Sequence, residues 1–211
     1  MVITYGRSGS TLLQTAMNGL DNVCIRGENY LAAAPLYESW RRIIAAQNDH
    51  GEKYSMPGQP WYGASQLDSE QFGKDLVAAF IRNVLRPEPH TEWIGFKEIR
   101  YNNMGNNFEG FIDFAFKYFP NLRVIFNLRD WDSVCSSGWF SKQDPKDVRS
   151  MLSKMEERFA RSAARYPGQS MTVRYEEMIA NPGEYKNVAD FLNVPFDAHR
   201  IATILEKKLT H

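Results

Sequence analysis

The first twenty residues constrain the fold most, because they read as a buried strand, a glycine-containing turn and the start of a helix. The segment 2–5 is a short apolar run that ends at Gly6, as a buried parallel strand does. Apolar residues at helical spacing follow between positions 10 and 20: Leu12, Leu13, Ala16, Met17 and Leu20. A strand that enters a helix through such a turn is the context of a phosphate-binding loop.

The turn itself, Gly6-Arg-Ser-Gly-Ser-Thr11, lacks the lysine of a nucleotide-hydrolysing loop. That loop places lysine directly before its last hydroxyl residue, and here Ser10 stands there instead. Backbone amides at a helix N-terminus still bind an anion, and Arg7 adds a planar fork that suits an oxyanion. A plain Gly/Ser turn before a helix is the structural alternative.

A second anion-binding element is predicted more than a hundred residues later. Residues 122–128 read as a buried strand, and Arg129 follows at its carboxyl end. A helix predicted over 131–140 would put Ser137 about two turns in, so that Arg129 and Ser137 share one anion where ligands of open α/β sheets bind. The alternative is an arginine paired with a neighbouring aspartate and a small helix residue.

Further strands and helices alternate along the chain. Strands are predicted over 92–96 and 170–174, and helices over 30–47, 68–86, 109–119 and 145–165. This order predicts an α/β fold of three layers, similar to P-loop proteins, with a central, mostly parallel sheet between helices in a single domain over 1–211. The polar segment 48–66 is either a lid or acceptor-binding loop, or a surface excursion.

Composition excludes several partners. Lys+Arg and Asp+Glu are both 25, and this zero net charge argues against nucleic-acid binding. No apolar run reaches membrane-spanning length, so no membrane partner is expected. The chain begins with a strand and not an export signal, which predicts a cytoplasmic protein with free thiols at Cys24 and Cys135. We expect a monomer or a weak homodimer.

Three segments resemble the sulfotransferases that use 3′-phosphoadenosine-5′-phosphosulfate (PAPS). TYGRSGSTLL resembles their 5′-phosphosulfate loop, FNLRDWDSVCSS their 3′-phosphate element, and VRYEEMIANPGEYKNVADFLNVP (173–195) their later strand end and helix. The segments occur in the family's order and span positions 2 to 195. The resemblance implies PAPS as co-substrate, 3′-phosphoadenosine-5′-phosphate (PAP) as product, and no metal.

The resemblance also implies roles for individual residues. It assigns the 5′-phosphate and the sulfuryl group to the loop, and the 3′-phosphate and adenine to later residues. The loop residues are Arg7, Ser8, Gly9, Ser10, Thr11 and Leu12; Arg129 and Ser137 would bind the 3′-phosphate, and Tyr175 would lie near the adenine. Arginine in place of the common lysine at position 7 resembles the carbohydrate-type and bacterial branches.

Glu28 is the predicted general base. It follows the loop helix and should return to the carboxyl edge of the sheet, where Gly27-Glu28 resembles the glutamate base of the tyrosylprotein and bacterial trehalose branches. A glutamate that stabilises a helix N-terminus is the alternative. None of the four histidines, His50, His90, His199 and His211, stands in a comparable setting.

The stretch EWIGFKEIR (92–100) adds a third cluster. Lys97, just beyond the predicted strand, would neutralise charge on the sulfuryl oxygens, and Glu98 is the reserve base. Both could instead belong to a solvated strand edge. The zero net charge and the pairing of Arg7 with Glu28 favour a carbohydrate or small-metabolite hydroxyl as acceptor.

The C-terminus departs from the family pattern. Many members close the 3′-phosphate site with a Gly-rich basic segment, which this chain lacks, so that Lys207 or Lys208 would substitute or the site would be more open. Two other functions remain: a small-molecule kinase with a degenerate phosphate loop, and a catalytically silent nucleotide-binding protein.

Overall fold

The computed structural model describes residues 1–206. The chain divides into two compact units, the first of residues 1–31, 87–109 and 122 onward, the second of residues 32–86 and 110–121. All the predicted site residues belong to the first unit. The single domain predicted over 1–211 stays a prediction.

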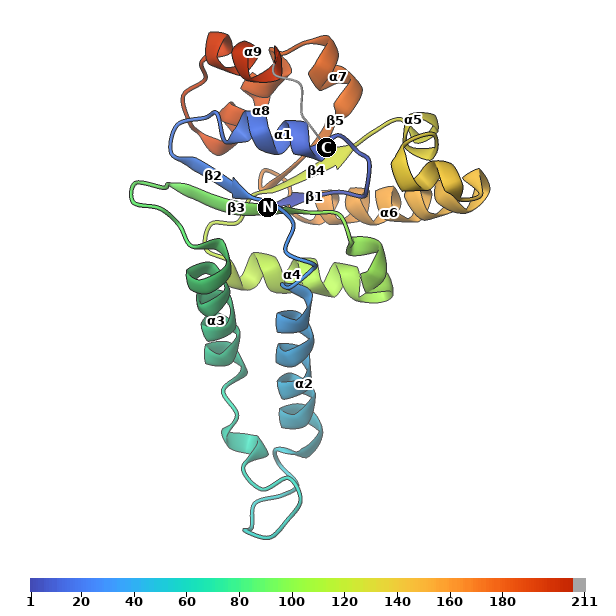
Figure 1. The fold of residues 1–211 in the computed structure, drawn as a ribbon. Coiled ribbons are helices and arrows are strands. Elements are labelled where there is room, and N and C mark those ends of the chain that lie inside the picture. The colour runs from blue at the N-terminus through green and yellow to red at the C-terminus, as the bar shows by residue number, and fades with distance from the viewer. Residues whose placement is uncertain (207–211) are drawn as a thin grey trace. The chain divides into compact units, whose positions relative to one another are not determined.

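The first unit is built on a sheet of five parallel strands in the order β2-β3-β1-β4-β5 (Figure 1). The strands are β1 (Val2–Ile3), β2 (Val23–Arg26), β3 (Trp93–Glu98), β4 (Val124–Leu128) and β5 (Ser170–Arg174). Central β1 pairs through Val2 with Lys97 of β3 and with Ile125 of β4. Because the five strands run in one direction, their carboxyl ends meet at one edge of the sheet. The predicted α/β fold with a parallel sheet is confirmed.

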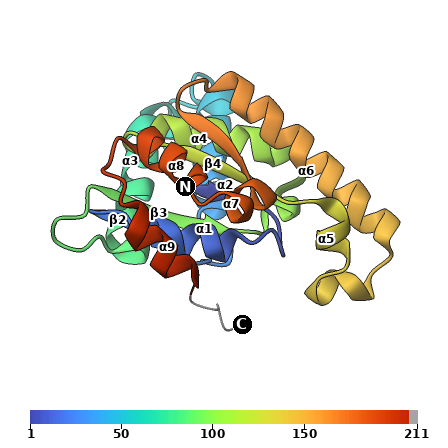
Figure 2. The same ribbon diagram turned by 90° about the horizontal axis from the view of Figure 1, so that it is seen from above.

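Helices cover both faces of this sheet and give the predicted three layers (Figures 1 and 2). On one side lie α1 (Ser10–Met17), α8 (Glu184–Leu192) and α9 (Ala198–Glu206), and on the other α6 (Pro145–Arg165). Successive side chains of a strand point to opposite faces of the sheet, so each strand packs against both layers of helices. Ile125 belongs to the core cluster of α1 and α8, whereas its neighbour Phe126 stacks on Phe159 of α6 at 5.0 Å between ring centroids.

Shorter elements complete the first unit. They are the 3₁₀ segments η3 (Tyr101–Asn107) and η4 (Gly138–Lys142), the helices α5 (Trp131–Cys135) and α7 (Tyr175–Ala180), and the first residues of α4 (Phe108–Tyr118). Cys24 and Cys135 are free thiols, as predicted. Among the described residues, no helix combines the length and the apolar character needed to cross a bilayer.

The second unit is helical. It contains α2 (Ala34–His50), η1 (Ala64–Gln66), α3 (Ser69–Phe80), the π-helical turn η2 (Ile81–Leu85) and most of α4. Its core is aromatic: the Trp40 ring centroid lies 5.3 Å from that of Phe114, and Trp40 Nε1 donates to the Tyr118 hydroxyl at 3.0 Å. Segment 48–66 belongs to this unit, with Trp61 stacked on His50 at 4.1 Å. Its predicted role as a lid stays a prediction.

β3 is longer than predicted. The strand continues to Glu98, past the predicted end at position 96, because Val2 and Ile3 pair in register with Lys97 and Glu98. Lys97 therefore lies inside the strand and not beyond it. Its side chain is fixed by the sheet, with only 5% of the residue exposed.

The helix predicted over 131–140 is wrong in its second half. α5 ends at Cys135, and Gly138 has φ 56°, a left-handed conformation in which a helix commonly ends. Ser137 has the extended φ and ψ of −108° and 131°, directly before η4. Ser137 is therefore not two turns into a helix, and the short extended segment determines where its hydroxyl lies.

Candidate active site

The turn between β1 and α1 has the backbone of an anion-binding loop. Arg7 and Gly9 both have left-handed φ values, 63° and 75°. Gly9 is the N-cap residue of α1, and its carbonyl accepts the first helical bond, from the N–H of Leu12 at 2.9 Å. The preceding N–H groups at the helix N-terminus are therefore left for a ligand. A Cβ at Gly9 would lie 2.1 Å from the Tyr175 ring, so packing also requires glycine here.

β4 holds the loop in place from the side of the sheet. Asn127 Nδ2 donates to the Ser8 carbonyl at 2.9 Å, and the Thr4 hydroxyl donates to the Asn127 carbonyl at 2.6 Å. Thr4 Oγ1 also lies 2.7 Å from Ser8 Oγ, and both residues are fully buried. The Ser8 hydroxyl is thus used inside the protein, and the group that Ser8 can offer to an anion is its backbone N–H.

The Arg7 side chain lies against the segment that follows α5. Its Nε donates to Ser137 Oγ at 3.0 Å, and its guanidinium carbon lies 5.6 Å from the centroid of the Trp139 ring. A Cβ at Gly138 would come within 2.8 Å of Arg7 Nε, so glycine permits this close approach. The two residues assigned to opposite ends of the donor, Arg7 and Ser137, are therefore in direct contact.

Arg129 extends from the end of β4 to the same loop. Its Nη1 donates to the Arg7 carbonyl at 2.9 Å, and its guanidinium carbon lies 4.5 Å from the centroid of the Tyr175 ring. Its Nε is buried without a hydrogen-bond partner. The aspartate alternative fails: Asp130 caps α5 through the Ser133 N–H, and Asp132 pairs with an arginine of α6. A buried donor without a partner is costly, which is typical of a ligand-binding arginine.

Glu28 lies two residues beyond β2, at the carboxyl edge of the sheet, as predicted. Its Oε1 accepts from Lys97 Nζ at 2.7 Å, and its Oε2 accepts from Arg100 Nη1 at 2.7 Å. About a third of the Glu28 side chain is exposed (30%), so the carboxylate is accessible from the cleft. The hydrogen bond to Glu28, against the opposing effect of burial, raises the pKa of Arg100, which therefore keeps its charge.

Glu98 is fully buried and occupied by bonds from its surroundings. It accepts the backbone N–H groups of Leu31 at 2.7 Å and Ile99 at 2.8 Å, and Arg100 Nη1 at 2.9 Å. Burial by itself would raise the pKa of Glu98, but these bonds outweigh it and lower the pKa below the usual 4.5. Glu98 is thus a stable anion that fixes the turn after Glu28.

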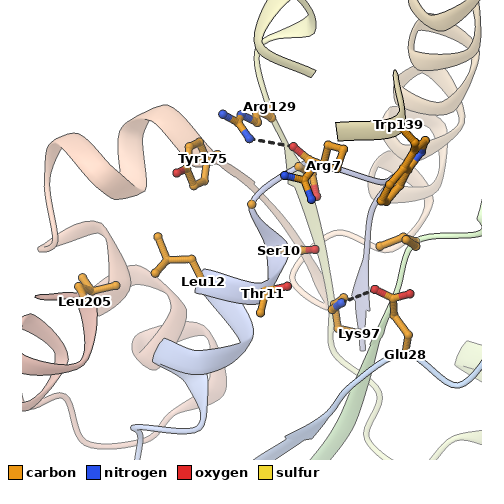
Figure 3. A pocket seen from close by; sticks show the side chains of 13 residues that line it. Arg7, Ser10, Thr11, Leu12, Glu28, Lys97, Arg129, Trp139, Tyr175 and Leu205 are labelled. Carbon is orange, nitrogen blue, oxygen red and sulfur yellow. Dashed lines mark hydrogen bonds and ion pairs between the residues drawn. The ribbon is translucent and has the colours of Figure 1, made fainter. Parts of the chain in front are cut away.

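These groups line one cleft of about 480 Å³ in the first unit (Figure 3). The predicted residues that line it are Arg7, Ser8, Gly9, Ser10, Thr11, Leu12, Glu28, Lys97, Arg129 and Tyr175. Ser137 is not part of the lining and reaches it only through Arg7. In Figure 3, Arg129 and Tyr175 lie toward one end of the cleft and Lys97 and Glu28 toward the other, on the side to which the Ser10 and Thr11 hydroxyls extend.

Sequence reasoning missed part of the cleft lining and one of the two cations that bind Glu28. Ile99 and Leu205 line the cleft but carry no chemical signal. Trp139 also lines the cleft; the sequence made it one of several aromatic candidates for stacking on an acceptor but gave it no position. Arg100 had a usable signal, because it closes a run of three charged residues at the end of a strand, but no role was assigned to it.

The histidines and the possible metal ligands were also located within the described part of the chain. His50, His90 and His199 do not line the cleft, and no group of three or more His, Cys, Asp or Glu side chains forms a potential metal site between residues 1 and 206. His211 and the predicted substitutes Lys207 and Lys208 lie outside the described residues.

Comparison with known proteins agrees with this geometry. The profile of the Sulfotransferase family matches residues 1–198. No curated protein sequence matches the chain. Among solved structures, the sulfotransferase domain from the curacin biosynthetic pathway has a TM-score of 0.61 and 16% identity, over 98% of this chain and 77% of that one. The sulfotransferase domain of the Synechococcus PCC 7002 olefin synthase has a TM-score of 0.61 and 15% identity, over 98% and 76%.

A third structure, retinol dehydratase in complex with androsterone and the inactive cofactor PAP, has a TM-score of 0.45 and 18% identity, over 97% of this chain and 62% of that one. At these identities the solved structures establish the fold alone. The family rests on the sequence profile, which covers nearly the whole described chain. The chain therefore belongs to the PAPS-dependent sulfotransferase family.

Proposed function

We propose that this protein transfers a sulfuryl group from PAPS to the hydroxyl of a carbohydrate or small-metabolite acceptor, with Glu28 as the general base. The observation that carries the proposal is the division of charge in the cleft. Arg7 and Arg129 make no ion pair with any carboxylate of residues 1–206, while Glu28 is accessible beside Lys97. An excess of cations at a helix N-terminus suits a polyanionic donor.

The donor fits the loop half of the cleft. The backbone N–H groups after Gly9 would bind the 5′-phosphate, and Arg7 would bind the sulfuryl end. Arg129, with its unpartnered buried Nε, would take the 3′-phosphate, and Tyr175, which already stacks on this guanidinium, would flank the adenine. Ser137 would join Arg129 once Arg7 Nε releases its hydroxyl.

The transfer reaction depends on the other half of the cleft, around Glu28 and Lys97. As the acceptor oxygen forms its bond to sulfur, the bond between sulfur and the 5′-phosphate oxygen of the donor breaks, and PAP leaves with that electron pair. Glu28 accepts the hydroxyl proton, a contribution of about 10²–10⁴ in rate. Lys97 and the loop stabilise charge on the oxygens of the transferring group.

The structure favours Glu28 over Glu98 as the base. Glu98 is inaccessible, and both of its oxygens accept hydrogen bonds from the backbone. Glu28 binds two cations but keeps an exposed surface. A base has to reach the proton that it removes, and only Glu28 meets this condition.

Thermal unfolding with PAP or with magnesium-ATP tests the donor assignment. At about 100-fold excess over Kd, PAP should add ~2.7 kcal/mol of stability, a rise of roughly 5–10 °C in Tm for a chain of this size. A rise with magnesium-ATP and none with PAP would mean a kinase. A rise with PAP and no release of PAP from PAPS in an acceptor screen would mean a silent nucleotide-binding protein.

A further inference from the structure

A second pocket adjoins the donor cleft within the first unit. It has a volume of about 660 Å³ and shares Ile99 and Trp139 with the cleft. Arg100, whose Nη1 lies 2.7 Å from Glu28 Oε2, is on its wall. Glu28 is thus linked through Arg100 to the wall of this second pocket.

The second pocket continues into a third one of about 330 Å³. The two share Asn102, Asp147 and Met151, so together they form one groove along α6, which lies on the other side of the sheet from α1 and α8 (Figure 1). Asp147, Met151, Lys154 and Arg158 follow one another at helical spacing on the groove face. At 1.5 Å per residue, this stripe spans about 16 Å. The groove therefore suits a long acceptor better than a single compact ring.

The part of the groove nearest Glu28 has no spare positive charge. Arg100 is its one cation, and it is neutralised by Glu28 and by Glu98 at 2.9 Å. Phe140 and Val148 contribute apolar groups, and Asn102, Asn103 and Gln143 contribute neutral amides. The carboxylate of Asp147, where this pocket meets the third one, adds a negative charge and no positive one. Met151 continues the apolar surface and adapts readily to flexible chains, with the buried Met155 beneath it. An uncharged, largely apolar segment fits here.

The far end of the groove differs, because two cations meet there. Lys154 and Arg158 are four residues apart on α6, where like charges repel. Neither forms an ion pair within residues 1–206, and the nearest acidic side chain of α4, Glu109, pairs with Arg161. Arg158 makes only a long hydrogen bond to Asn106, at 3.5 Å. A bound anion would relieve this repulsion.

We propose that the acceptor is an elongated hydroxylated molecule whose far end carries an anionic group, a carboxylate or a phosphate, bound by Lys154 and Arg158. This inference rests on the proposed function. It places the reacting hydroxyl at Glu28, between Ile99 and Trp139, and the uncharged body over Met151. The anion lies about three helical turns along α6 from Asp147.

Matched acceptors test the proposal. The probes are ω-hydroxy fatty acids of increasing chain length, their methyl esters, and the corresponding ω-hydroxyalkyl phosphates, all with saturating PAPS. We expect the long acids and phosphates to have KM values at least about tenfold lower than the esters, as charge-assisted bonds imply. Short acids should lose this advantage. The KM values of the fatty acids and of the alkyl phosphates, compared at equal chain length, show which anion binds better.

Charge-reversal variants test whether Lys154 and Arg158 bind the anionic end of the acceptor. Lys154→Glu/Arg158→Glu should remove the advantage of the acids over the esters through KM, with kcat and the affinity for PAP unchanged. Lys146→Glu, on an exposed cation of the same helix outside the groove, is the matched control, and Lys154→Gln/Arg158→Gln is the milder variant. Three results would overturn the proposal. Acids and esters could have equal KM values, the preference for acids could survive the double charge reversal, or no probe could be sulfated although PAP binds. If the unaltered chain did not bind PAP at all, the donor assignment would be refuted instead.

Discussion

The two halves of the donor cleft handle charge in opposite ways. Around the loop, Arg7 and Arg129 contact a hydroxyl, a carbonyl and aromatic rings, but no carboxylate within the described chain. Around Glu28, two carboxylates and two cations alternate in one continuous line of ion pairs. The first half keeps a positive excess that a polyanion can use. The second is electrically balanced, so a neutral hydroxyl can enter and lose its proton there.

This difference predicts that the halves fail separately when they are mutated. Substitutions around the loop should weaken donor binding, whereas substitution of Glu28 should slow the transfer and leave binding intact. A single substitution that changed both the affinity for PAP and the rate of transfer would contradict this separation.

The largest expected effect is that of Glu28→Gln. The amide keeps the shape of the side chain but cannot accept the proton, so kcat should fall by about 10²- to 10⁴-fold with little change in the Kd of PAP. Single-turnover kinetics with labelled PAPS and PAP titration measure the two quantities. Glu88→Gln is the control, since Glu88 is also paired with an arginine but lies on the surface. An unchanged kcat would remove Glu28 from the role of base.

Arg129→Ala comes next. Loss of its charge-assisted bonds should raise the Kd of PAP by roughly 10- to 100-fold. Calorimetric titration measures the affinity, and Arg149→Ala, on an exposed arginine paired with Asp132, is the matched control. If Arg129→Ala left the Kd unchanged and lowered kcat alone, the loop half would not be the donor half.

Gly9→Ala should destabilise the loop itself by about 1–3 kcal/mol. The φ of 75° is unfavourable for alanine, and its Cβ would overlap the Tyr175 ring. We expect a lower Tm together with weaker PAP binding. Gly58→Ala, which has φ 94° but no atom within 4 Å of the added Cβ, separates backbone strain from the steric clash. Equal losses in the two variants would mean that Tyr175 does not pack on the loop as described.

The smallest effect concerns pH. Since the pKa of Glu98 is lowered by folding, the stability that its anion contributes is present above the usual pKa of 4.5 and is lost as the pH falls through the folded value. The Tm should therefore drop on acidification below about pH 4.5, and Glu98→Gln should flatten this drop while lowering the Tm at neutral pH. Thermal scans at stepped pH measure it, with Glu109→Gln as the comparison for a more exposed ion pair. An unaltered slope in Glu98→Gln would place the acid lability elsewhere.

Much of the fold and of the site was predictable from the sequence, because local signals and the geometry of a parallel sheet act together. Gly6 to Thr11 between apolar runs predicted the loop, and the strand before Arg129 predicted that this arginine reaches the same edge. Glu28 was expected at this edge because it follows the loop helix, although the strand β2 that carries it there was not predicted. The roles implied by the family resemblance stay predictions.

The rest depended on contacts between distant segments. The sequence favoured a helix through Ser137, but the helix ends at Cys135, and the extended Ser137 places its hydroxyl on Arg7. Glu98 resembled a solvated carboxylate, and only the pairing of β3 with β1 explains its complete burial. Tertiary contacts of this kind leave no periodic pattern for sequence reasoning to detect.

The left-handed backbone at Arg7 has a consequence for protein engineering. A residue with a Cβ pays about 1–2 kcal/mol for that conformation, whereas glycine adopts it freely and asparagine tolerates it. A library selected for heat resistance alone should therefore enrich glycine or asparagine at position 7. A library selected for turnover should retain arginine, so the residue found there after selection would report which of the two demands the population had met.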